Sequence, residues 1–346
     1  AQARELVDMT LKSLDLPVDA LFSTLGRTAA RALESKILAD AMQGVQAVIS
    51  ALSFHANPVV AEAALRAGIS YFDLTEDVET TRAVRACAER AAEGQVFMPQ
   101  CGLAPGFINI LAHDLAGRLD HLDELRLRVG ALAQFPTGEL KYNLTWSTDG
   151  LINEYCNPCE AIQDGKKVEL QALEGLEHFS LDGVDYEAFN TSGGLGTLWE
   201  TYAGKVRKLD YKTVRYRGHR DLMHFLIREL RMHERRDQLK DILERAVPGT
   251  QQDVILIFAV ATGTKDGVYT QVSDARKIYH VQRDGRTWSG IQLTTSHGVC
   301  AVADLALDGR LPTRGFIRQE DVRLSDFLAN RFGSVYKTAA QPASSL

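Results

Sequence analysis

Residues 56–102, ANPVVAEAALRAGISYFDLTEDVETTRAVRACAERAAEGQVFMPQCG, decide the fold. They begin as an Ala-rich amphipathic helix that stops at Gly68, followed by a strand, ISYFDLT. A second helix then runs to Gly94, and a second strand, QVFMPQCG, follows it. Strands separated by helices of this length form a parallel sheet with helices on both faces. The segment therefore predicts a doubly wound α/β domain.

The chain upstream extends this domain but leaves it incomplete. QAVISAL reads as a further strand, and ARELVDMTLKSL and ESKILADAMQG read as helices. A Rossmann-like dinucleotide-binding domain opens with a strand, a GxGxxG turn and a helix, and no such turn occurs before this point. We expect the first strands of the sheet to precede Ala1. Residues 1–118 are thus predicted to be a partial Rossmann-like domain.

The chain downstream changes character. ELRLRVGALAQ, LKYNLTWS, KVELQAL, HFSLDGVDYEAFN and KTVRYRG have the alternating pattern of strands, and VILIFAVATGTKDG and KIYHVQRDGRTWSG resemble hairpin arms. A helical block, RDLMHFLIRELRMHERRDQLKDILERAV, interrupts them. We therefore predict an α+β domain over residues 119–297 that binds substrate and forms the dimer. Residues 298–335 should start with a helix and return to the first domain, and the length favours separate cores for the two domains.

Composition and charge limit the class of partner. The 346 residues have a formal net charge of −6, which argues against nucleic acid. No apolar run is long enough to span a bilayer and no signal peptide opens the chain, so a cytoplasmic protein away from the membrane is expected. The five cysteines have no disulfide-scaffold spacing. Cys156 and Cys159 form one CxxC without a second ligand pair, so no metal site is predicted.

Several ordered motifs indicate a family. QCGLAPGFINILAHDLAG, residues 100–117, resembles the segment that joins the two domains of saccharopine dehydrogenase-like enzymes. ISALSFHANPVVAEAALRAGISYFDLTED, EAFNTSGGLGTL and KTVRYRGH also resemble stretches of that group, and the likeness runs over residues 45–330. Within the group, the lysine 6-dehydrogenases are the most similar. The resemblance implies hydride transfer from the ε-carbon of L-lysine to NAD, or to NADP, followed by imine hydrolysis and cyclisation of the semialdehyde.

The cofactor should lie at the carboxyl ends of the parallel strands. We expect it to be bordered by Ser50, Ala51, Leu52, Ser53, Phe54, Asp73, Thr75, Cys101, Gly102 and Asn109. Asp73 and Glu76 are candidate acceptors for the proton that the amine loses, although DLTED also has the pattern of a helix cap. Cys101 either contacts the nicotinamide or packs the turn as a small buried residue.

A zwitterionic amino acid needs cationic donors for its carboxylate and an acceptor for its ammonium. Arg215, His219, Ser192 and Thr191 are the candidate donors, and Asp149 is the candidate acceptor. We place the other substrate contacts on the predicted strand LKYNLTWS and the turn after it, at Lys141, Thr145, Trp146, Ser147 and Thr148. The glycine-rich stretch TSGGLGTLWET precedes a helix near Thr197, whose N–H groups suit a substrate carboxylate better than a pyrophosphate.

Three alternatives stay open on sequence. The resemblance also allows a saccharopine dehydrogenase or a carboxynorspermidine-type reductase. A non-catalytic dinucleotide-binding or scaffold protein would keep the fold without the fingerprint. In each case a homodimer or a higher homo-oligomer is expected, because extended strands can join sheets across a two-fold axis.

Overall fold

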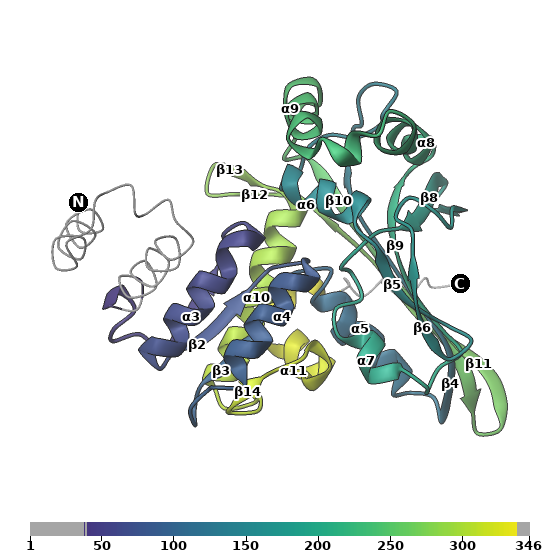
Figure 1. The fold of residues 1–346 in the computed structure, drawn as a ribbon. Coiled ribbons are helices and arrows are strands. Elements are labelled where there is room, and N and C mark those ends of the chain that lie inside the picture. Colours follow the sequence, from purple (N-terminus) through teal and green to yellow (C-terminus); the bar gives the residue numbers. More distant parts are fainter. Residues whose placement is uncertain (1–37, 39, 338–346) are drawn as a thin grey trace, which may run out of the picture.

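The computed structural model describes Leu38 and residues 40–337, arranged as two large sheets and a two-stranded hairpin, with helices between and around the large sheets (Figure 1). The smaller sheet and its helices form one lobe, and the larger sheet forms the other. The helix predicted at residues 3–14 lies outside the described residues, as does the first part of the helix predicted at residues 34–44. The prediction of an α/β fold with a parallel sheet and a second domain is confirmed.

The smaller sheet is parallel, in the order β1-β2-β3-β14. Its strands are β1 (Ala47–Ser50), β2 (Ser70–Asp73), β3 (Val96–Met98) and β14 (Gly315–Phe316). Tyr71 and Phe97 pair across β2 and β3 and pack with α3 (Asn57–Ala67) and α4 (Val78–Ala88). Phe72 and Met98 face the opposite side and join the main core. Both faces are therefore covered, as a parallel sheet requires.

Helix ends on this sheet follow local chemistry. Gly68 ends α3 in the left-handed conformation, with φ of 72°. Asp77 caps α4 by accepting a hydrogen bond from the Thr80 N–H at 2.7 Å. The helix was expected to continue to Gly94 but ends at Ala88, because Arg90 and Ala91 close tight turns onto carbonyls at the helix end.

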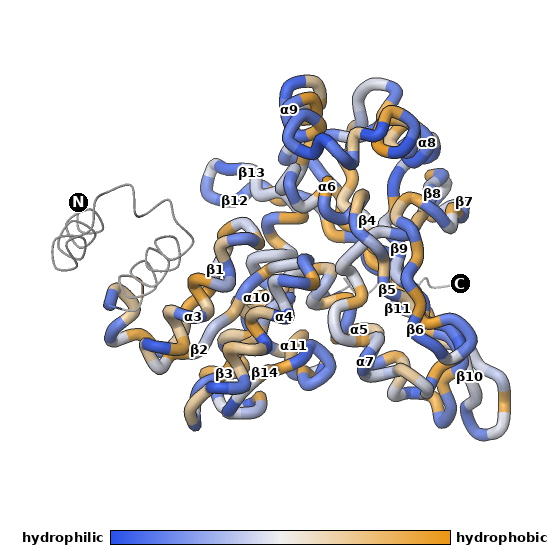
Figure 2. The backbone as a smooth tube through the Cα atoms, viewed as in Figure 1, coloured by the Kyte–Doolittle hydropathy of each residue, from blue (hydrophilic) through white to orange (hydrophobic). Residues whose placement is uncertain are grey.

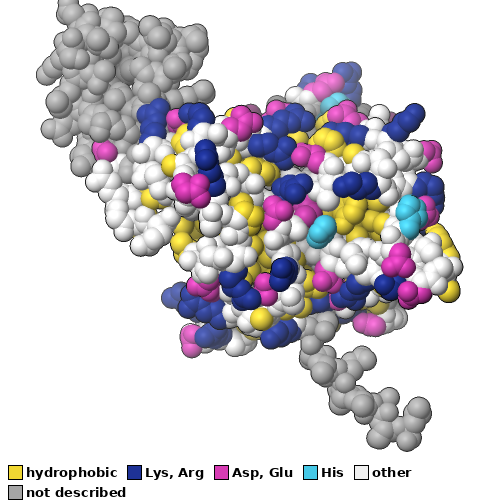
Figure 3. Space-filling model, turned by 90° about the horizontal axis from the view of Figure 1, so that it is seen from below, with side chains coloured by type: hydrophobic (Ala, Val, Ile, Leu, Met, Phe, Trp, Pro, Cys, Tyr) yellow, Lys and Arg dark blue, Asp and Glu magenta, His cyan; other side chains and the backbone are white. Residues whose placement is uncertain are grey.

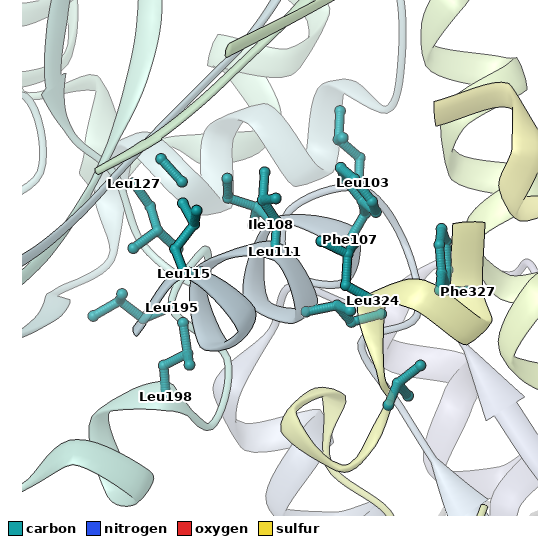
Figure 4. Packing of buried hydrophobic residues seen from close by; sticks show 14 of the residues in the cluster. Leu103, Phe107, Ile108, Leu111, Leu115, Leu127, Leu195, Leu198, Leu324 and Phe327 are labelled. Atoms are coloured by element: carbon teal, nitrogen blue, oxygen red, sulfur yellow. The ribbon is translucent and has the colours of Figure 1, made fainter. Parts of the chain in front are cut away.

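The helix α5 (Phe107–Ala116) joins the two lobes and carries the centre of the main core. It starts directly after Gly106, whose φ is 136°. Any side chain at this position would overlap the backbone of Gly102, so glycine is required here. Figure 4 shows Phe107 and Leu111 between residues of the C-terminal tail, such as Phe327, and residues of the second lobe, such as Leu127. The lobes thus share one continuous core, whereas the chain length favoured separate ones.

The larger sheet is mixed and has the order β11-β10-β4-β9-β5-β6, with β8 on β9 and β7 on β8. Its strands are β4 (His121–Ala133), β5 (Cys159–Gln163), β6 (Lys166–Leu170), β7 (Glu177–Leu181), β8 (Val184–Asn190), β9 (Lys208–Tyr216), β10 (Asp253–Lys265) and β11 (Val268–Tyr279). Its inner face, with Leu127 and Ile257, joins the main core. Hydrophobic and hydrophilic residues are interspersed along its strands (Figure 2).

Two predictions for the second lobe are wrong in detail. LKYNLTWS is not a strand: it makes a single bridge, Leu144 to Gly249, and then leads into α6 (Thr148–Cys156). The Ser147 hydroxyl caps that helix by accepting a hydrogen bond from the Gly150 N–H. A short polar run can therefore start a helix as well as form a turn. The helical block after residue 218 is divided into α8 (His219–His224), a π-helical turn (Phe225–Glu229) and α9 (Arg236–Ala246).

The C-terminal region ties the lobes together. After the small hairpin β12 (Val281–Arg283) and β13 (Arg286–Trp288), the helix α10 (Gly290–Leu307) begins eight residues before the expected start at Gly298. The Asp253 carboxylate accepts the N–H groups of Gly290 and Ile291 and so fixes this end. The tail then adds β14 beside β3 and ends with α11 (Leu324–Ala329), and Tyr336 stacks on Phe107.

The charged side chains on the surface are mixed in sign. Figure 3 shows one face, on which Lys and Arg side chains lie between Asp and Glu side chains. In the described part of the chain, no helix combines the length and the apolar character that crossing a membrane requires.

Candidate active site

A cavity of about 340 Å³ lies between the two lobes. One wall comes from the loops that follow β1, β2 and β3, where ligands of parallel α/β sheets bind. The opposite wall comes from the inner face of the larger sheet, from α6 and from α10. It is lined by Ala51, Leu52, Ser53, Phe54, Leu74, Thr75, Glu76, Gly102, Leu103, Ala104, Pro105, Val129, Ala131, Trp146, Ser147, Asp149, Glu154, Tyr211, Thr213, Arg215, Ile291 and Thr295.

Arg215 is a buried cation at this cavity. Its side chain comes from β9 and the residue is 3% exposed. Its Nε–H donates to the Tyr155 hydroxyl at 2.9 Å and Nη1 donates to the Val214 carbonyl at 2.9 Å. Within residues 40–337 it makes no hydrogen bond to a carboxylate and no ion pair. The remaining N–H groups of the guanidinium are therefore available to a ligand.

A chain of hydrogen bonds fixes the orientation of Arg215. The Leu140 carbonyl can only accept, so His219 Nδ1, 3.0 Å away, carries the proton. Nε2 then accepts from the Tyr155 hydroxyl at 3.0 Å, and that oxygen accepts from Arg215. Burial, with the Arg215 charge, lowers the pKa of His219 to about 3, so the ring is neutral. His219 positions the arginine and does not line the cavity.

Two carboxyl groups also line the cavity, one from each lobe. Glu154, on α6, is 7% exposed and has no hydrogen bond to its side chain from any described residue. Burial raises its pKa to about 8, although the Arg215 charge opposes this. Glu76 follows β2, and its buried Oε1 has no hydrogen-bond partner among the described residues. Burial, together with Asp77 and Asp73, raises the pKa of Glu76 to about 7.

About half of the predicted site residues line the cavity. On the cofactor side these are Ala51, Leu52, Ser53, Phe54, Thr75, Glu76 and Gly102, and on the substrate side Trp146, Ser147, Asp149 and Arg215. Asp149, the predicted ammonium acceptor, is paired at 2.6 Å with Lys240 of α9. The cavity therefore brings the predicted loops and the predicted arginine together, but it leaves Asp149 occupied.

Two candidates on the Rossmann-like side, Asp73 and Cys101, lie beneath the cavity wall. Asp73 is fully buried and accepts from the Tyr71 hydroxyl and from the N–H groups of Thr75 and Gln100. These bonds lower its pKa, but burial outweighs them and raises it to about 6. Cys101 is 1% exposed, and burial raises its pKa well above the usual thiol value. Their positions correct the catalytic assignments, because neither side chain reaches the cavity.

The other candidates have structural partners. The Ser50 hydroxyl donates to Asn57 at 2.7 Å, and Asn109 caps α5 and donates to the Leu195 carbonyl. Thr191 shares a hydrogen bond with Thr213 at 2.7 Å, behind the wall, and the Ser192 N–H donates to the Glu154 carbonyl. Exposed Lys141 donates to the Arg217 carbonyl. Lys141, Thr145, Thr148, Thr191, Ser192, His219, Ser50 and Asn109 do not line the cavity.

The predicted anion site near Thr197 is filled by the chain itself. The hydroxyl groups of Thr197 and Thr201 donate to the Glu320 carboxylate at 2.7 and 2.8 Å. The helix that follows, α7 (Leu198–Tyr202), has five residues. The TSGGLGTLWET stretch thus anchors the C-terminal tail to the second lobe.

Glu154 is the main residue that sequence reasoning missed. It follows Ser147 by seven residues and Gly150 by four, which places all three on one helix face. That spacing indicates a shared helix face only once α6 is recognised as a helix. The predicted strand LKYNLTWS, directly before α6, obscured it. Tyr211, Thr213, Ile291 and Thr295 also line the cavity, and only their contacts across the lobes identify them.

The cavity fits the nicotinamide end of a dinucleotide. Small residues and backbone from the loops after β1 and β3 form an open wall there, including Ala51, Ser53 and Gly102. Among the described residues, no GxGxxG turn follows a strand to hold the pyrophosphate. No group of three or more potential metal ligands is clustered within them either.

Comparison with known families assigns the second lobe and the linking helix. The saccharopine dehydrogenase C-terminal domain family matches residues 102–332, two thirds of the chain. The chain belongs to this family. The match includes α5, the larger sheet and the returning tail, and it therefore covers Arg215 and Glu154.

One solved structure agrees with this chain on the fold. The apo saccharopine dehydrogenase (L-Glu forming) from Saccharomyces cerevisiae has 15% identity and a TM-score of 0.65, over 88% of this chain and 83% of that one. At this identity the likeness shows the two-lobed fold. The DAP dehydrogenase of C. glutamicum in complex with DAP is also similar, with 11% identity and a TM-score of 0.38 over 85% of this chain and 84% of that one.

A different likeness is confined to the N-terminal region. The nickel-dependent hydrogenase family matches residues 1–67. An uptake hydrogenase large subunit from Rhizobium leguminosarum bv. viciae is 69% identical over 36 residues, which are 10% of this chain and 6% of that protein. The chain thus spans a small fraction of that curated relative, and the match says nothing of the cavity.

Proposed function

We propose that this protein is an NAD(P)-dependent dehydrogenase that oxidises an amine of an amino acid, with the ε-amine of L-lysine as the substrate. The observation that carries the proposal is Arg215, a buried guanidinium without a carboxylate partner in the described chain, which faces the loops at the ends of β1, β2 and β3. An arginine in this state suits a substrate carboxylate. The membership in a saccharopine dehydrogenase domain family supports the reaction class.

The residues of the cavity can position the reacting groups. A nicotinamide bound against the loops of the smaller sheet would accept a hydride from the carbon that bears the amine. Arg215 and those loops line opposite walls, so a carboxylate held by Arg215 places the distal end of the side chain toward the smaller sheet. Water then hydrolyses the imine to an aldehyde and ammonia. Close positioning of this kind supplies much of the rate in hydride transfer.

Glu76 is the candidate proton acceptor in this scheme. It lies on the same wall as the cofactor loops, and its pKa near 7 leaves a large ionised fraction at neutral pH. The ammonium of the substrate must lose a proton before the carbon gives up a hydride. Glu76 replaces Asp73 in this role, because the Asp73 side chain is held beneath the wall by Tyr71.

Charge favours lysine over saccharopine. Glu76, Glu154 and Asp149 line the cavity, and Arg215 is the one cationic side chain that lines it among the described residues. Saccharopine carries two more carboxylates than lysine does. They would meet further acidic groups and find no second cation on the wall, so a substrate with a second amine fits the cavity better.

The test is an initial-rate assay of the full chain with L-lysine, saccharopine and L-ornithine in turn, each with NAD and with NADP. Formation of reduced nicotinamide is followed by absorbance. L-Lysine with NAD should give the highest kcat/KM, and Arg215→Gln should raise KM more than it lowers kcat. If no amino acid supports reduction of either cofactor, the proposed function is wrong.

A further inference from the structure

Arg215 and Glu154, a buried guanidinium and a buried carboxyl group, line one cavity without pairing. Arg215 comes from the inner face of β9, and Glu154 comes from α6. They interact electrostatically, yet no ion pair within 4.0 Å joins them. Each side chain therefore lines the cavity without the other as its partner.

We propose that Glu154 and Arg215 form the two halves of a zwitterion site, in which Arg215 binds the α-carboxylate of an amino acid and Glu154 binds its α-ammonium. The proposal rests on the proposed function and names the feature of the substrate that the second lobe selects. It assigns the distal amine, rather than the α-amine, to the wall that carries Glu76.

The electrostatics of burial favour a ligand that carries both charges. A charge removed from water is costly unless it gains a partner of opposite charge, and neither group forms an ion pair with another residue of the described chain. A simple anion would satisfy Arg215 and leave Glu154 alone, whereas a simple cation would do the reverse. The head group of an α-amino acid satisfies both groups at once.

The surroundings keep the two groups apart and oriented. Tyr155 holds one edge of the guanidinium, and Val214 accepts from another part of it. The Ser192 N–H, in the loop after β8, donates to the backbone carbonyl of Glu154 on α6 and fixes that helix turn against the second lobe. None of these three contacts uses the carboxyl group of Glu154, which is therefore available to accept hydrogen bonds from an ammonium.

Asp149 is the competing acceptor, and its position argues against it. It also lines the cavity from α6, but Lys240 of α9 already pairs with it at 2.6 Å. Its side chain is 41% exposed, so an ammonium there would be exchanged for water at little cost. Glu154 is the deeper and the unpaired carboxyl.

Binding of the ammonium should depend on pH. Glu154 is protonated in much of the free protein at neutral pH, because burial raises its pKa to about 8. The ligand binds the ionised form through its own ammonium, so affinity should rise with pH toward about 8 and fall again once the α-ammonium of the ligand loses its proton. The charged and titratable groups that face Glu154 are Arg215 and Tyr211 from β9, Glu76 from the loop after β2, Tyr142, Tyr155 and Cys159.

The experiment compares three ligands by isothermal titration calorimetry on the full chain. L-Lysine has both head charges, 6-aminohexanoate lacks the α-ammonium, and 1,5-diaminopentane lacks the carboxylate. The wild-type protein should bind lysine about tenfold to hundredfold more tightly than either analogue. Equal affinity for lysine and 6-aminohexanoate would overturn the role of Glu154.

Variants assign each half of the site. Glu154→Gln should remove the preference for lysine over 6-aminohexanoate and the rise of affinity with pH, and it should keep the preference over 1,5-diaminopentane. Arg215→Gln should show the reverse pattern. Glu79→Gln, an exposed carboxyl change on α4, is the control that keeps both preferences. If Asp149→Asn, rather than Glu154→Gln, removes the first preference, the assignment to Glu154 is wrong.

Failure of this inference can be told from failure of the proposed function. If lysine is oxidised but 6-aminohexanoate is oxidised with the same kcat/KM, the function holds and the zwitterion site is refuted. If lysine binds with both preferences but no cofactor is reduced, the site holds and the dehydrogenase function is refuted. Unfolding temperatures of all variants confirm that each one folds.

Discussion

Two buried arginines of the larger sheet differ in one respect. Arg128 on β4 is 5% exposed and faces outward, where it donates to Glu177 and, at 2.5 Å, to Asp210. Arg215 on β9 is 3% exposed and faces the cavity, where no carboxylate of the described chain meets it. Both are held by strands that pair with each other. The fold gives the first arginine two carboxylate partners, whereas the second contacts only tyrosines and a carbonyl within the described chain.

The acidic groups near these arginines show the same contrast. Burial opposes ionisation of Asp210, but Arg128 outweighs it and holds the pKa of Asp210 below its usual value. At Glu154, in contrast, burial dominates and raises the pKa to about 8, because the more distant Arg215 does not offset the effect of burial. A buried charge that its own protein leaves unpaired is a candidate for function, because stability alone does not explain it.

The largest expected effect is on the paired side. Arg128→Ala should lower the free energy of unfolding by about 3–5 kcal/mol, since it leaves Asp210 buried without its main partner. Denaturant unfolding measures this. Arg126→Ala, on the same strand and face, should change it by less than about 1 kcal/mol, because that side chain is 48% exposed. Similar losses for the two variants would remove the contrast.

The unpaired carboxyl should reduce stability in a pH-dependent way. The pKa of Glu154 is about 8 in the folded protein and 4.5 by its ordinary value. Ionisation therefore weakens the fold as pH rises from about 4.5 to about 8. Glu154→Gln should gain roughly 2–4 kcal/mol at about pH 9 and almost nothing at about pH 4. A gain that is equal at both pH values would contradict the assigned shift.

On the unpaired side, the cost should appear in binding. Arg215→Gln should weaken L-lysine binding by about 1.5–3 kcal/mol, since a charged hydrogen-bond donor is lost. The free energy of unfolding should not fall by more than about 1 kcal/mol, because no buried carboxylate loses a partner. Calorimetric titration and denaturant unfolding of the same preparation give the two values. A large loss of stability with unchanged binding would make Arg215 a second structural arginine.

The smallest effect is on positioning. Tyr155→Phe removes the hydroxyl that links His219 to Arg215, and it should weaken lysine binding by about 1 kcal/mol. The kcat should change little, since neither group contacts the reacting carbon. A fall in kcat at constant KM would place Tyr155 in the chemistry instead.

Local patterns in the sequence were sufficient for the smaller sheet. The alternation of helix and strand in residues 56–102 predicts α3, β2, α4 and β3, and the ends of β1 and β2 give the loops 51–54 and 74–76 of the cavity. These features depend on neighbours in sequence. Arg215 could also be selected, because a zwitterionic substrate needs a cationic donor for its carboxylate.

The rest depends on contacts between distant residues. Whether Asp73 points into a cavity or lies beneath its wall is decided by Tyr71 and by the Gln100 N–H, which the strand-end pattern does not reveal. The availability of Asp149 depends on Lys240, ninety-one residues away. Glu154 was missed because the polar run at Ser147 was assigned to a strand, although it caps a helix.

The most direct test is a crystal structure of the full chain with L-lysine. The account predicts a lysine carboxylate bound to the Arg215 guanidinium, with the distal amine directed toward Glu76 and the loops after β1 and β2. A lysine bound with its carboxylate toward those loops, or outside the cavity with Arg215 left unpaired, would contradict the account.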